Sequence, residues 1–306
     1  MSEAALQHLQ TVRDWIRWGA SRFTQAGLFF GHGTATAVDE AAALVLHTVH
    51  LPYDLPFTYF DAVLLPEERS RIFALIERRT AERKPLAYLL RETQFAGLTF
   101  YVDERVLVPR SPIAELIEER FAPWVDPDGV HAVLDLCTGS GCIAIAIAHA
   151  FPDAVVDATD ISPDALAVAR INVERHDLAE RVRLIRADLF DGLEGAKYDL
   201  IVSNPPYVAR AEWQGLPAEY HAEPRLGLES GADGLDAARR ILAEAGSHLN
   251  PGGALIVEVG NSAAVLEEAF PEVPFCWLEF SRGGEGVFAL TAEQLNEWAD
   301  LFGNAD

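Results

Sequence analysis

The stretch Ala132-Val133-Leu134-Asp135-Leu136-Cys137-Thr138-Gly139-Ser140-Gly141-Cys142 decides how this sequence folds. Ala132–Leu136 is a short apolar run that predicts a strand. The small residues and glycines after it predict a tight turn, followed by a helix over Ser140–His149. In a doubly wound sheet, ligands bind beyond the carboxyl ends of the parallel strands, at a turn of this kind. The stretch therefore predicts a parallel α/β fold and also the place of a ligand site.

Strands and helices alternate along the chain after this stretch. Further strands are predicted at Ala154–Thr159, Val182–Arg186, Tyr198–Val202 and Ala254–Val259, and helices at 162–175, 232–249 and 263–269. Apolar strands separated by helices indicate a parallel sheet that is covered on both faces. Two final strands, Phe275–Phe280 and Gly286–Leu290, are expected to be joined by a short Gly-rich turn, so the end of the sheet should be antiparallel.

The chain before residue 90 is predicted to be helical and carries no chemical motif. Leu6–Phe23 has apolar residues at helical spacing, Asp39–Val49 is rich in Ala and Leu, and Pro66 begins a third helix. A helical bundle without a site of its own is usually a recognition or packing module. The β-type residues of Thr93–Val108 then predict a hairpin, and a stiff Pro-containing loop leads into a helix over 113–121.

The composition narrows the class of partner. The 306 residues carry a net charge of −23, from 24 basic and 47 acidic residues, so the surface should repel nucleic-acid phosphates and attract a basic protein. An acidic surface also serves solubility alone, and charge by itself does not separate these two explanations. No secretory signal and no membrane-spanning run of roughly 18 apolar residues is found. Cys137, Cys142 and Cys276 lack metal spacing, which favours free thiols in the cytoplasm.

The predicted ligand site has the features of a nucleoside cofactor site. Asp160 follows Gly139 by 21 residues, at the end of the second strand, where a carboxylate can accept hydrogen bonds from a ribose diol. The predicted cofactor residues are Asp135, Cys137, Thr138, Gly139, Ser140, Gly141, Asp160, Asp188, Leu189 and Asn204, with no metal site. A dinucleotide prefers a third glycine where Ala144 stands, so the loop favours S-adenosyl-L-methionine over a dinucleotide.

A second motif, Asn204-Pro205-Pro206-Tyr207, directly follows the fourth strand and is predicted to be catalytic. The two prolines remove two backbone donors and stiffen the segment. It would therefore present two fixed acceptors, the Asn204 side-chain oxygen and the Pro205 carbonyl oxygen. These acceptors suit a planar NH2 group, and Tyr207 supplies a flat face beside it. Orientation of this kind suits in-line methyl transfer, which needs no metal and no covalent nucleophile.

Together these motifs resemble the class I methyltransferases that modify exocyclic or amide nitrogens, and the whole chain resembles the protein-(glutamine-N5) methyltransferases. The resemblance implies a seven-stranded sheet of order 3-2-1-4-5-7-6. It also implies three parts: an N-terminal helical substrate-recognition domain over 1–90, a β-hairpin linker over 91–112 and a methyltransferase domain over 113–306. Cys137 departs from the wider class, in which many members have glycine.

The resemblance also separates two branches of this family. Pro109-Arg110-Ser111-Pro112-Ile113 matches the branch that methylates a glutamine of large ribosomal subunit protein three, whereas the release-factor branch typically has Pro-Arg-Pro-Asp-Thr-Glu. The implied partner is a basic ribosomal protein, met free or during ribosome assembly. Release factors are the alternative substrate.

Other interpretations are weaker. A nicotinamide dehydrogenase would leave the motif Asn204–Tyr207 unexplained. A DNA adenine-N6 methyltransferase should have a basic groove, which a net charge of −23 disfavours. A non-enzymatic ribosome-assembly factor would not need an intact Asp160. His47 and His50 lack a third metal ligand. Three charged residues have two interpretations each. Arg110 fits either a place at the substrate entry or an ordinary ion pair. Glu223 and Glu258 fit either the pocket or, respectively, a turn and a solvent-facing strand end.

Overall fold

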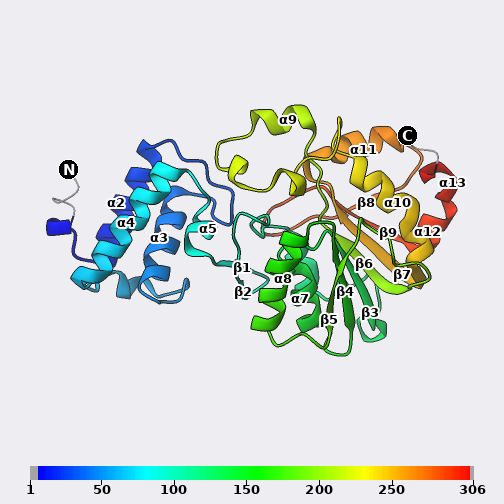
Figure 1. The fold of residues 1–306 in the computed structure, drawn as a ribbon, viewed down its shortest axis with the longest axis horizontal. Coiled ribbons are helices and arrows are strands. Elements are labelled where there is room, and N and C mark those ends of the chain that lie inside the picture. The colour runs from blue at the N-terminus through cyan, green and yellow to red at the C-terminus, as the bar shows by residue number, and fades with distance from the viewer. Residues whose placement is uncertain (1–5, 304–306) are drawn as a thin grey trace. The chain divides into compact units, whose positions relative to one another are not determined.

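The structure is a computed structural model that describes residues 6–303 and divides into two compact units (Figure 1). Unit 1 comprises Met1–Thr93 together with Pro217–Ala222, and unit 2 comprises Gln94–Leu216 and Glu223–Asp306. The outermost residues of the predicted domains, 1–5 and 304–306, lie outside the described residues. The sequence did not indicate that a short segment from its C-terminal half packs within the helical unit.

Unit 1 is a helical bundle. Its elements are α2 (Val12–Gln25), α3 (Ala37–Thr48), η1 (Phe57–Asp61), α4 (Pro66–Glu82), α5 (Leu86–Leu90) and the 3-10 turn η3 (Tyr220–Ala222). Its core contains Trp15, Phe23 and Leu44, all fully buried. Pro66 begins α4, as the sequence predicted.

The helix that the apolar spacing from Leu6 predicted is interrupted: residues 6–8 are helical, residues 9–11 are not, and α2 begins at Val12. Thr11 is the N-cap of α2: its side chain accepts a hydrogen bond from the amide of Asp14, and the Asp14 carboxylate accepts one from the amide of Thr11. This capping box fixes the start at Val12. Leu6 still packs against the unit 1 core, which explains why its spacing fits the apolar pattern.

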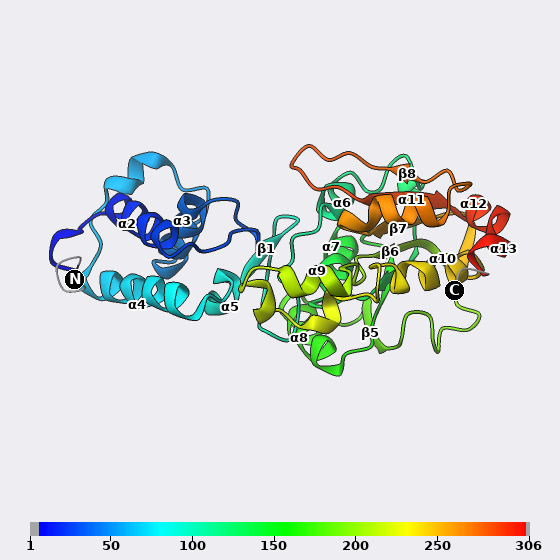
Figure 2. The same cartoon turned by 90° about the horizontal axis from the view of Figure 1, so that it is seen from above.

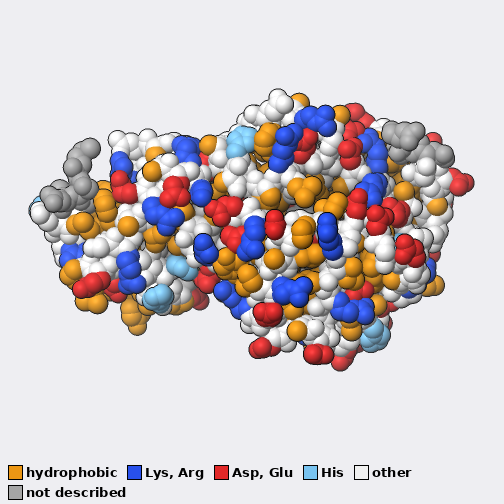
Figure 3. All heavy atoms as spheres, viewed as in Figure 1, with side chains coloured by type: hydrophobic (Ala, Val, Ile, Leu, Met, Phe, Trp, Pro, Cys, Tyr) orange, Lys and Arg blue, Asp and Glu red, His pale blue; other side chains and the backbone are white. Residues whose placement is uncertain are grey.

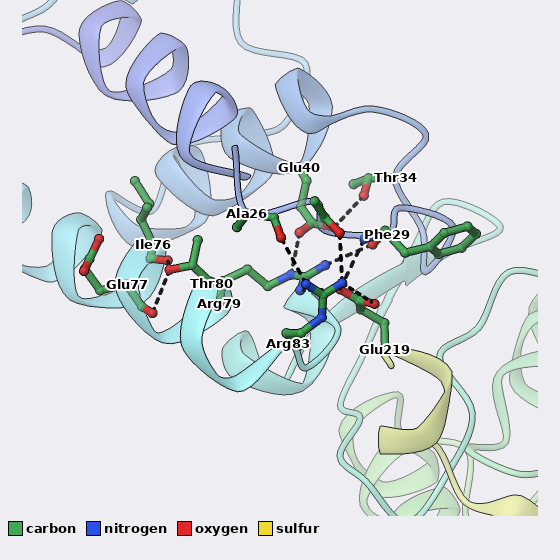
Figure 4. A network of polar contacts seen from close by, with 11 residues as sticks. Ala26, Phe29, Thr34, Glu40, Ile76, Glu77, Arg79, Thr80, Arg83 and Glu219 are labelled. Carbon is green, nitrogen blue, oxygen red and sulfur yellow. Dashed lines mark hydrogen bonds and ion pairs between the residues drawn. The ribbon is translucent and has the colours of Figure 1, made fainter. Parts of the chain in front are cut away.

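A buried ion network binds the segment 217–222 within unit 1 (Figure 4). The side chains of Arg79 and Glu219 are both fully buried. Arg79 Nε donates to Glu40 at 2.6 Å, and its Nη1 lies 3.5 Å from Glu219. Glu219 also accepts from the Phe29 amide at 3.2 Å and pairs with Arg83 at 3.0 Å. The buried carboxylates are therefore neutralised by arginines of α4 and its C-terminal end.

Unit 2 contains the seven-stranded sheet. Its strands are β3 (Ala132–Leu136), β4 (Val155–Asp160), β5 (Val182–Arg186), β6 (Tyr198–Ser203), β7 (Leu249–Glu258), β8 (Cys276–Trp277) and β9 (Val287–Thr291). The spatial order is β5-β4-β3-β6-β7-β9-β8, which is 3-2-1-4-5-7-6 when strands are counted within the sheet. β9 pairs antiparallel with β7 and β8, and the other pairs are parallel. The predicted fold class and strand order are confirmed.

Both faces of the sheet are covered, because alternate residues of each strand enter different cores. Leu200 and Val202 of β6 belong to one core and Ile201 to the other. The first core includes residues of α6 (Ile113–Glu118), α7 (Cys142–Ala150) and α8 (Pro163–Arg175). The second includes residues of α10 (Asp236–His248), α11 (Ala263–Ala269), α12 (Ala292–Glu297) and α13 (Ala299–Phe302). Figure 2 shows the helices around the sheet from above.

The hairpin is shorter than predicted. Its strands are β1 (Thr93–Phe95) and β2 (Leu98–Phe100), joined by Ala96-Gly97. Both turn residues have positive φ, 46° and 73°, as a two-residue hairpin turn of type I′ requires. Residues 102–108 form no strand, although Val102, Val106 and Val108 are buried.

Other element boundaries differ from the sequence prediction. β7 begins at Leu249, because Asn250–Gly253 forms an irregular part of the strand, with a register shift opposite β6 between Tyr198 and Leu200. α10 accordingly ends at His248. β8 and β9 are joined by residues 278–286 rather than by a short turn. The remaining elements are η2 (Pro127–Gly129), α9 (Arg210–Gly215), η4 (Arg225–Gly227) and η5 (Gly260–Ser262).

Candidate active site

A pocket in unit 2 lies where β3, β4 and β6 end, as expected for a doubly wound sheet. The predicted residues that line it are Cys137, Thr138, Gly139, Ser140, Asp160, Asp188, Leu189, Asn204, Pro206 and Tyr207. Asp135, Gly141 and Pro205 are not part of the lining. Sequence reasoning missed the lining residues Cys142, Ile143, Ile161 and Ser162, which flank the predicted ones. The two motifs that the sequence singled out thus meet in one cavity.

Asp135 shapes the loop after β3 from behind. Its side chain is fully buried, and its Oδ2 accepts from the Thr138 hydroxyl at 2.5 Å and from the Ala144 amide at 3.1 Å. Burial raises the pKa of Asp135 to about 7. Gly139, with φ +55°, has open space where a side chain would stand, so its backbone is accessible from the pocket. Asp135 is placed to hold the loop, and Gly139 to let a ligand approach it.

Asp160, at the end of β4, brings a carboxylate to the pocket. Its two oxygens accept from the amides of Gly139 and Ser162, each at 2.9 Å. A carboxylate has about four acceptor positions, so these bonds leave capacity for ligand hydroxyls. Burial raises the pKa of Asp160, and the two backbone hydrogen bonds lower it. The backbone contacts fix the carboxylate at the mouth of the turn.

The remaining lining residues fit the rest of a nucleoside. Leu189 and Ile161 offer apolar surface for a base, and the Asp188 carboxylate, which pairs with Arg240 at 2.8 Å, lies beside them in the lining. The pocket thus offers carboxylates that can accept hydrogen bonds from hydroxyl groups and apolar side chains that can pack on a flat ring. These features match the adenosine part of S-adenosylmethionine. Among residues 6–303, no cluster of three His, Cys, Asp or Glu side chains could hold a metal ion.

Asn204 directly follows β6. The Ser203 hydroxyl donates to the Leu136 carbonyl at 2.9 Å, which ties the end of β6 to that of β3 and so joins the two motifs. The Asn204 side chain lines the pocket and forms no hydrogen bond with any other residue of the described chain. Pro205 is buried, and Pro206 lines the pocket. A carboxamide without a protein partner thus stands on a segment held rigid by two prolines.

Tyr207 is fixed at both ends. Its hydroxyl donates to Glu258 Oε1 at 3.1 Å, and its carbonyl accepts from the Ser262 hydroxyl at 2.7 Å. Glu258 ends β7 and is buried; its Oε2 accepts from the Ser111 hydroxyl at 2.5 Å. Burial raises the pKa of Glu258. Glu258 therefore lies behind the pocket wall, although the sequence left open whether it would face the pocket.

Arg110 and Glu223 form the other support of this wall. Arg110 donates to both oxygens of Glu223, at 2.7 and 2.9 Å, and Glu223 also accepts from the Val108 amide at 2.9 Å. The bidentate pair fixes the stiff loop that the sequence predicted at Pro109–Pro112. The two residues were interpreted separately from the sequence, and nothing there indicated that they pair, since 113 positions separate them.

Comparisons with known proteins show the family of the chain. Residues 14–90 match the model of the PrmC N-terminal domain, and residues 121–217 match that of the methyltransferase small domain. A ribosomal protein uL3 glutamine methyltransferase of Neisseria meningitidis serogroup B is 56% identical over 296 residues, which are 96% of this chain and 97% of that protein. The protein of the same name from Francisella tularensis is 50% identical, with 97% and 95% covered. The chain belongs to this family of glutamine methyltransferases.

The fold of this methyltransferase also recurs in solved structures. The hMettl16 catalytic domain in complex with MAT2A 3'UTR hairpin 1 is 19% identical and has a TM-score of 0.50, with 78% of this chain and 84% of that chain covered. At this identity the likeness concerns the fold alone. It supports the class I methyltransferase architecture inferred from the strand order.

The structure explains two residues that stood out in the sequence, Cys137 and His47. Cys137 has φ +59°, a left-handed conformation that favours glycine, which fits the glycine of many related enzymes. Burial raises the pKa of its thiol.

His47 belongs to unit 1, where its Nδ1 lies 3.3 Å from Glu92 and 3.4 Å from the Tyr53 hydroxyl. No helix within residues 6–303 is long and apolar enough to span a bilayer.

Proposed function

We propose that this chain transfers the methyl group of S-adenosylmethionine to the side-chain amide nitrogen, N5, of a glutamine in ribosomal protein uL3. The observation that carries the proposal is the state of Asn204. Its carboxamide lines the pocket without a protein partner, whereas nearby Tyr207, Ser111 and Arg110 are all engaged in hydrogen bonds. Since these three side chains already have protein partners, Asn204 is placed to hold a substrate.

In the cofactor half of the pocket, different residues would contact different parts of S-adenosylmethionine. Asp160 would accept hydrogen bonds from the ribose hydroxyls, and Leu189 would pack on the adenine. When bound, S-adenosylmethionine supplies an electrophilic methyl group and its own leaving group. The residues of the loop after β3, especially Thr138 and Gly139, would approach the amino-acid part of the cofactor through their backbone. Asp135 supports this loop from behind.

The chain's own contribution to the reaction is to orient the substrate amide. The Asn204 side-chain oxygen would accept an N–H bond of the glutamine NH2 group, and Tyr207 would pack against its plane. The Pro205 carbonyl, which the sequence predicted as a second acceptor, belongs to a buried residue that does not line the pocket. The contacts with Asn204 and Tyr207 hold the nitrogen lone pair toward the methyl group, and orientation of this kind is worth roughly 7–11 kcal/mol of the barrier. The N–methyl bond forms as the sulfur–methyl bond breaks, and the proton then lost from nitrogen goes to solvent.

The charge of the chain fits a basic protein substrate. Net charge is −23, and on the face shown in Figure 3 acidic and basic side chains are interspersed. A continuous basic stripe would be expected for a groove that follows a nucleic-acid backbone. Unit 1 is proposed to recognise the protein substrate, met free or during ribosome assembly. On this proposal, the reaction takes place in the cytoplasm.

The proposal is tested with labelled S-adenosylmethionine, purified uL3 and purified peptide release factors. The expected result is incorporation into uL3 at a much higher kcat/KM than into a release factor. Preferential labelling of release factors would move the chain to the other substrate. Labelling of neither protein, with S-adenosylmethionine bound, would refute glutamine methylation of both.

A further inference from the structure

Glu258 joins two separate parts of the pocket wall without entering the pocket itself. It is the last residue of β7 and only 6% exposed, and it is not part of the pocket lining. One carboxylate oxygen accepts from the Tyr207 hydroxyl at 3.1 Å and the other from the Ser111 hydroxyl at 2.5 Å. Both donors line the pocket. A single buried group therefore holds the catalytic segment and the Pro-rich loop at once.

The Tyr207 ring is confined by the backbone that follows Glu258. Gly260 has φ +46°, and a Cβ on it would lie 2.7 Å from a ring carbon of Tyr207. The Ser262 hydroxyl, two residues later, donates to the Tyr207 carbonyl. The chain from 258 to 262 thus contacts the hydroxyl, the ring and the carbonyl of Tyr207. It leaves the tyrosine little freedom to change its position.

Ser111, like Tyr207, is fixed by more than one contact. Its hydroxyl oxygen donates its proton to Glu258 and accepts from the Ile113 amide at 3.2 Å, at the start of α6. The preceding residue Arg110 is fixed separately by Glu223. The two carboxylates therefore hold successive residues of one loop, and Glu258 also accepts from the Tyr207 hydroxyl.

We propose that Glu258 is a positioning residue for methyl transfer. It sets the position of Tyr207 relative to the Ser111 loop, and so the width of the slot, meaning the part of the pocket between Tyr207 and this loop that receives the substrate amide. This inference rests on the proposed function, because the slot is defined by the motif Asn204–Tyr207. A carboxylate suits the task because each of its two oxygens can accept a hydrogen bond from a different donor, both in one plane.

The test compares two buried carboxylates that each accept a tyrosine hydroxyl in the same unit. Asp157, in β4, accepts from the Tyr198 hydroxyl at 2.9 Å, is 5% exposed and does not line the pocket. Glu258→Ala, Glu258→Gln and the control Asp157→Ala are measured for kcat, KM, affinity for S-adenosylmethionine and thermal unfolding. Hydrogen exchange of peptides covering 108–113 and 204–209 is recorded without substrate.

Glu258→Ala is expected to lower kcat by about a hundredfold, because a displacement of about 1 Å in a reacting group has this effect, while affinity for the cofactor changes less than about threefold. Glu258→Gln, which keeps one acceptor, should recover about tenfold of this loss. Asp157→Ala should lower thermal stability without lowering kcat. Adding Tyr207→Phe to Glu258→Ala should cost less than the sum of the two single effects, since both remove one contact.

The exchange measurement separates this inference from the proposed function. Both peptides should exchange faster in Glu258→Ala than in the wild type or in Asp157→Ala, whatever the substrate proves to be. Unchanged exchange, or a kcat within about threefold of the wild type, would overturn the role of Glu258. A wild-type enzyme that methylates neither uL3 nor release factors would instead overturn the proposed function, with the exchange result still deciding the role of Glu258.

Discussion

Replacing Arg79 with methionine is expected to destabilise unit 1 by about 3–5 kcal/mol, the usual cost of breaking a buried ion pair from one side. Methionine fills much of the same space but leaves the buried carboxylates of Glu40 and Glu219 without their shared cation. The side chains of Arg79, Glu40 and Glu219 are 0%, 2% and 0% exposed, so water does not replace the lost contacts. The effect therefore depends on burial rather than on the number of ion pairs.

The contacts that remain set the size of the loss. Glu219 keeps Arg83, 3.0 Å away and 35% exposed, together with the Phe29 amide. Within residues 6–303, Glu40 keeps only the Thr34 hydroxyl at 3.0 Å. Glu40 is thus the group left without compensation, and the loss should correspond to one such charge rather than two. A loss of about 4 kcal/mol lowers the urea midpoint by about 2 M at a slope of about 2 kcal/mol per M.

The assay is urea denaturation of the full chain, with hydrogen exchange of α2 peptides to assign the transition to unit 1. Two units can unfold in separate steps, so the exchange data are needed for the assignment. Arg78→Met is the matched control: its side chain is 52% exposed and pairs with Glu82 at i,i+4. A surface pair of this kind is worth about 0.3–0.5 kcal/mol. The reasoning is refuted if Arg79→Met lies within about 1 kcal/mol of Arg78→Met.

Two further predictions concern pH and substrate recognition. Burial raises the pKa of Asp135 to about 7, so the stability that its protonation gives is present below pH 4 and is lost as pH rises to about 7. Thermal unfolding of Asp135→Asn should therefore depend less steeply on pH across this range, and parallel curves would contradict the assignment. Phe57, 77% exposed in unit 1, should contact the protein substrate: Phe57→Asp should lower kcat/KM about tenfold for intact uL3 but not for a short glutamine peptide. The control Ile171→Asp, 38% exposed on α8, should alter neither, and equal effects of both variants would count against recognition by unit 1.

The fold followed from the sequence because its signals are local. The apolar run Ala132–Leu136, its glycine turn and the later strand–helix alternation each lie within a few residues, and the strand order came from the family resemblance. The start of α2 was misjudged for a local reason too. Apolar spacing continues to Leu6, and residues 6–8 are helical, but the Thr11 cap starts α2 as a separate helix.

The candidate site was predictable only in part. Asp160 and Asn204–Tyr207 occupy strand ends, and the carboxyl ends of neighbouring parallel strands necessarily meet. Two of the supporting contacts, Arg110–Glu223 and Ser111–Glu258, join residues that are 113 and 147 positions apart. No spacing rule links such positions, and each acid resembles an ordinary surface or turn residue in the sequence. Their roles depend on burial, which only the folded chain reveals.

The central claim is that Asn204 holds a glutamine side-chain amide for methylation. The direct measurement is tandem mass spectrometry of uL3 after reaction with methyl-labelled S-adenosylmethionine, for the wild type, Asn204→Ala and the control Asn296→Ala, together with calorimetry of cofactor binding. The label is expected on the side-chain nitrogen of one glutamine. Asn204→Ala should lower kcat/KM by about 100-fold or more while cofactor affinity changes less than about threefold, and Asn296→Ala should behave as the wild type. Label on any other atom, or normal transfer by Asn204→Ala, would contradict the claim.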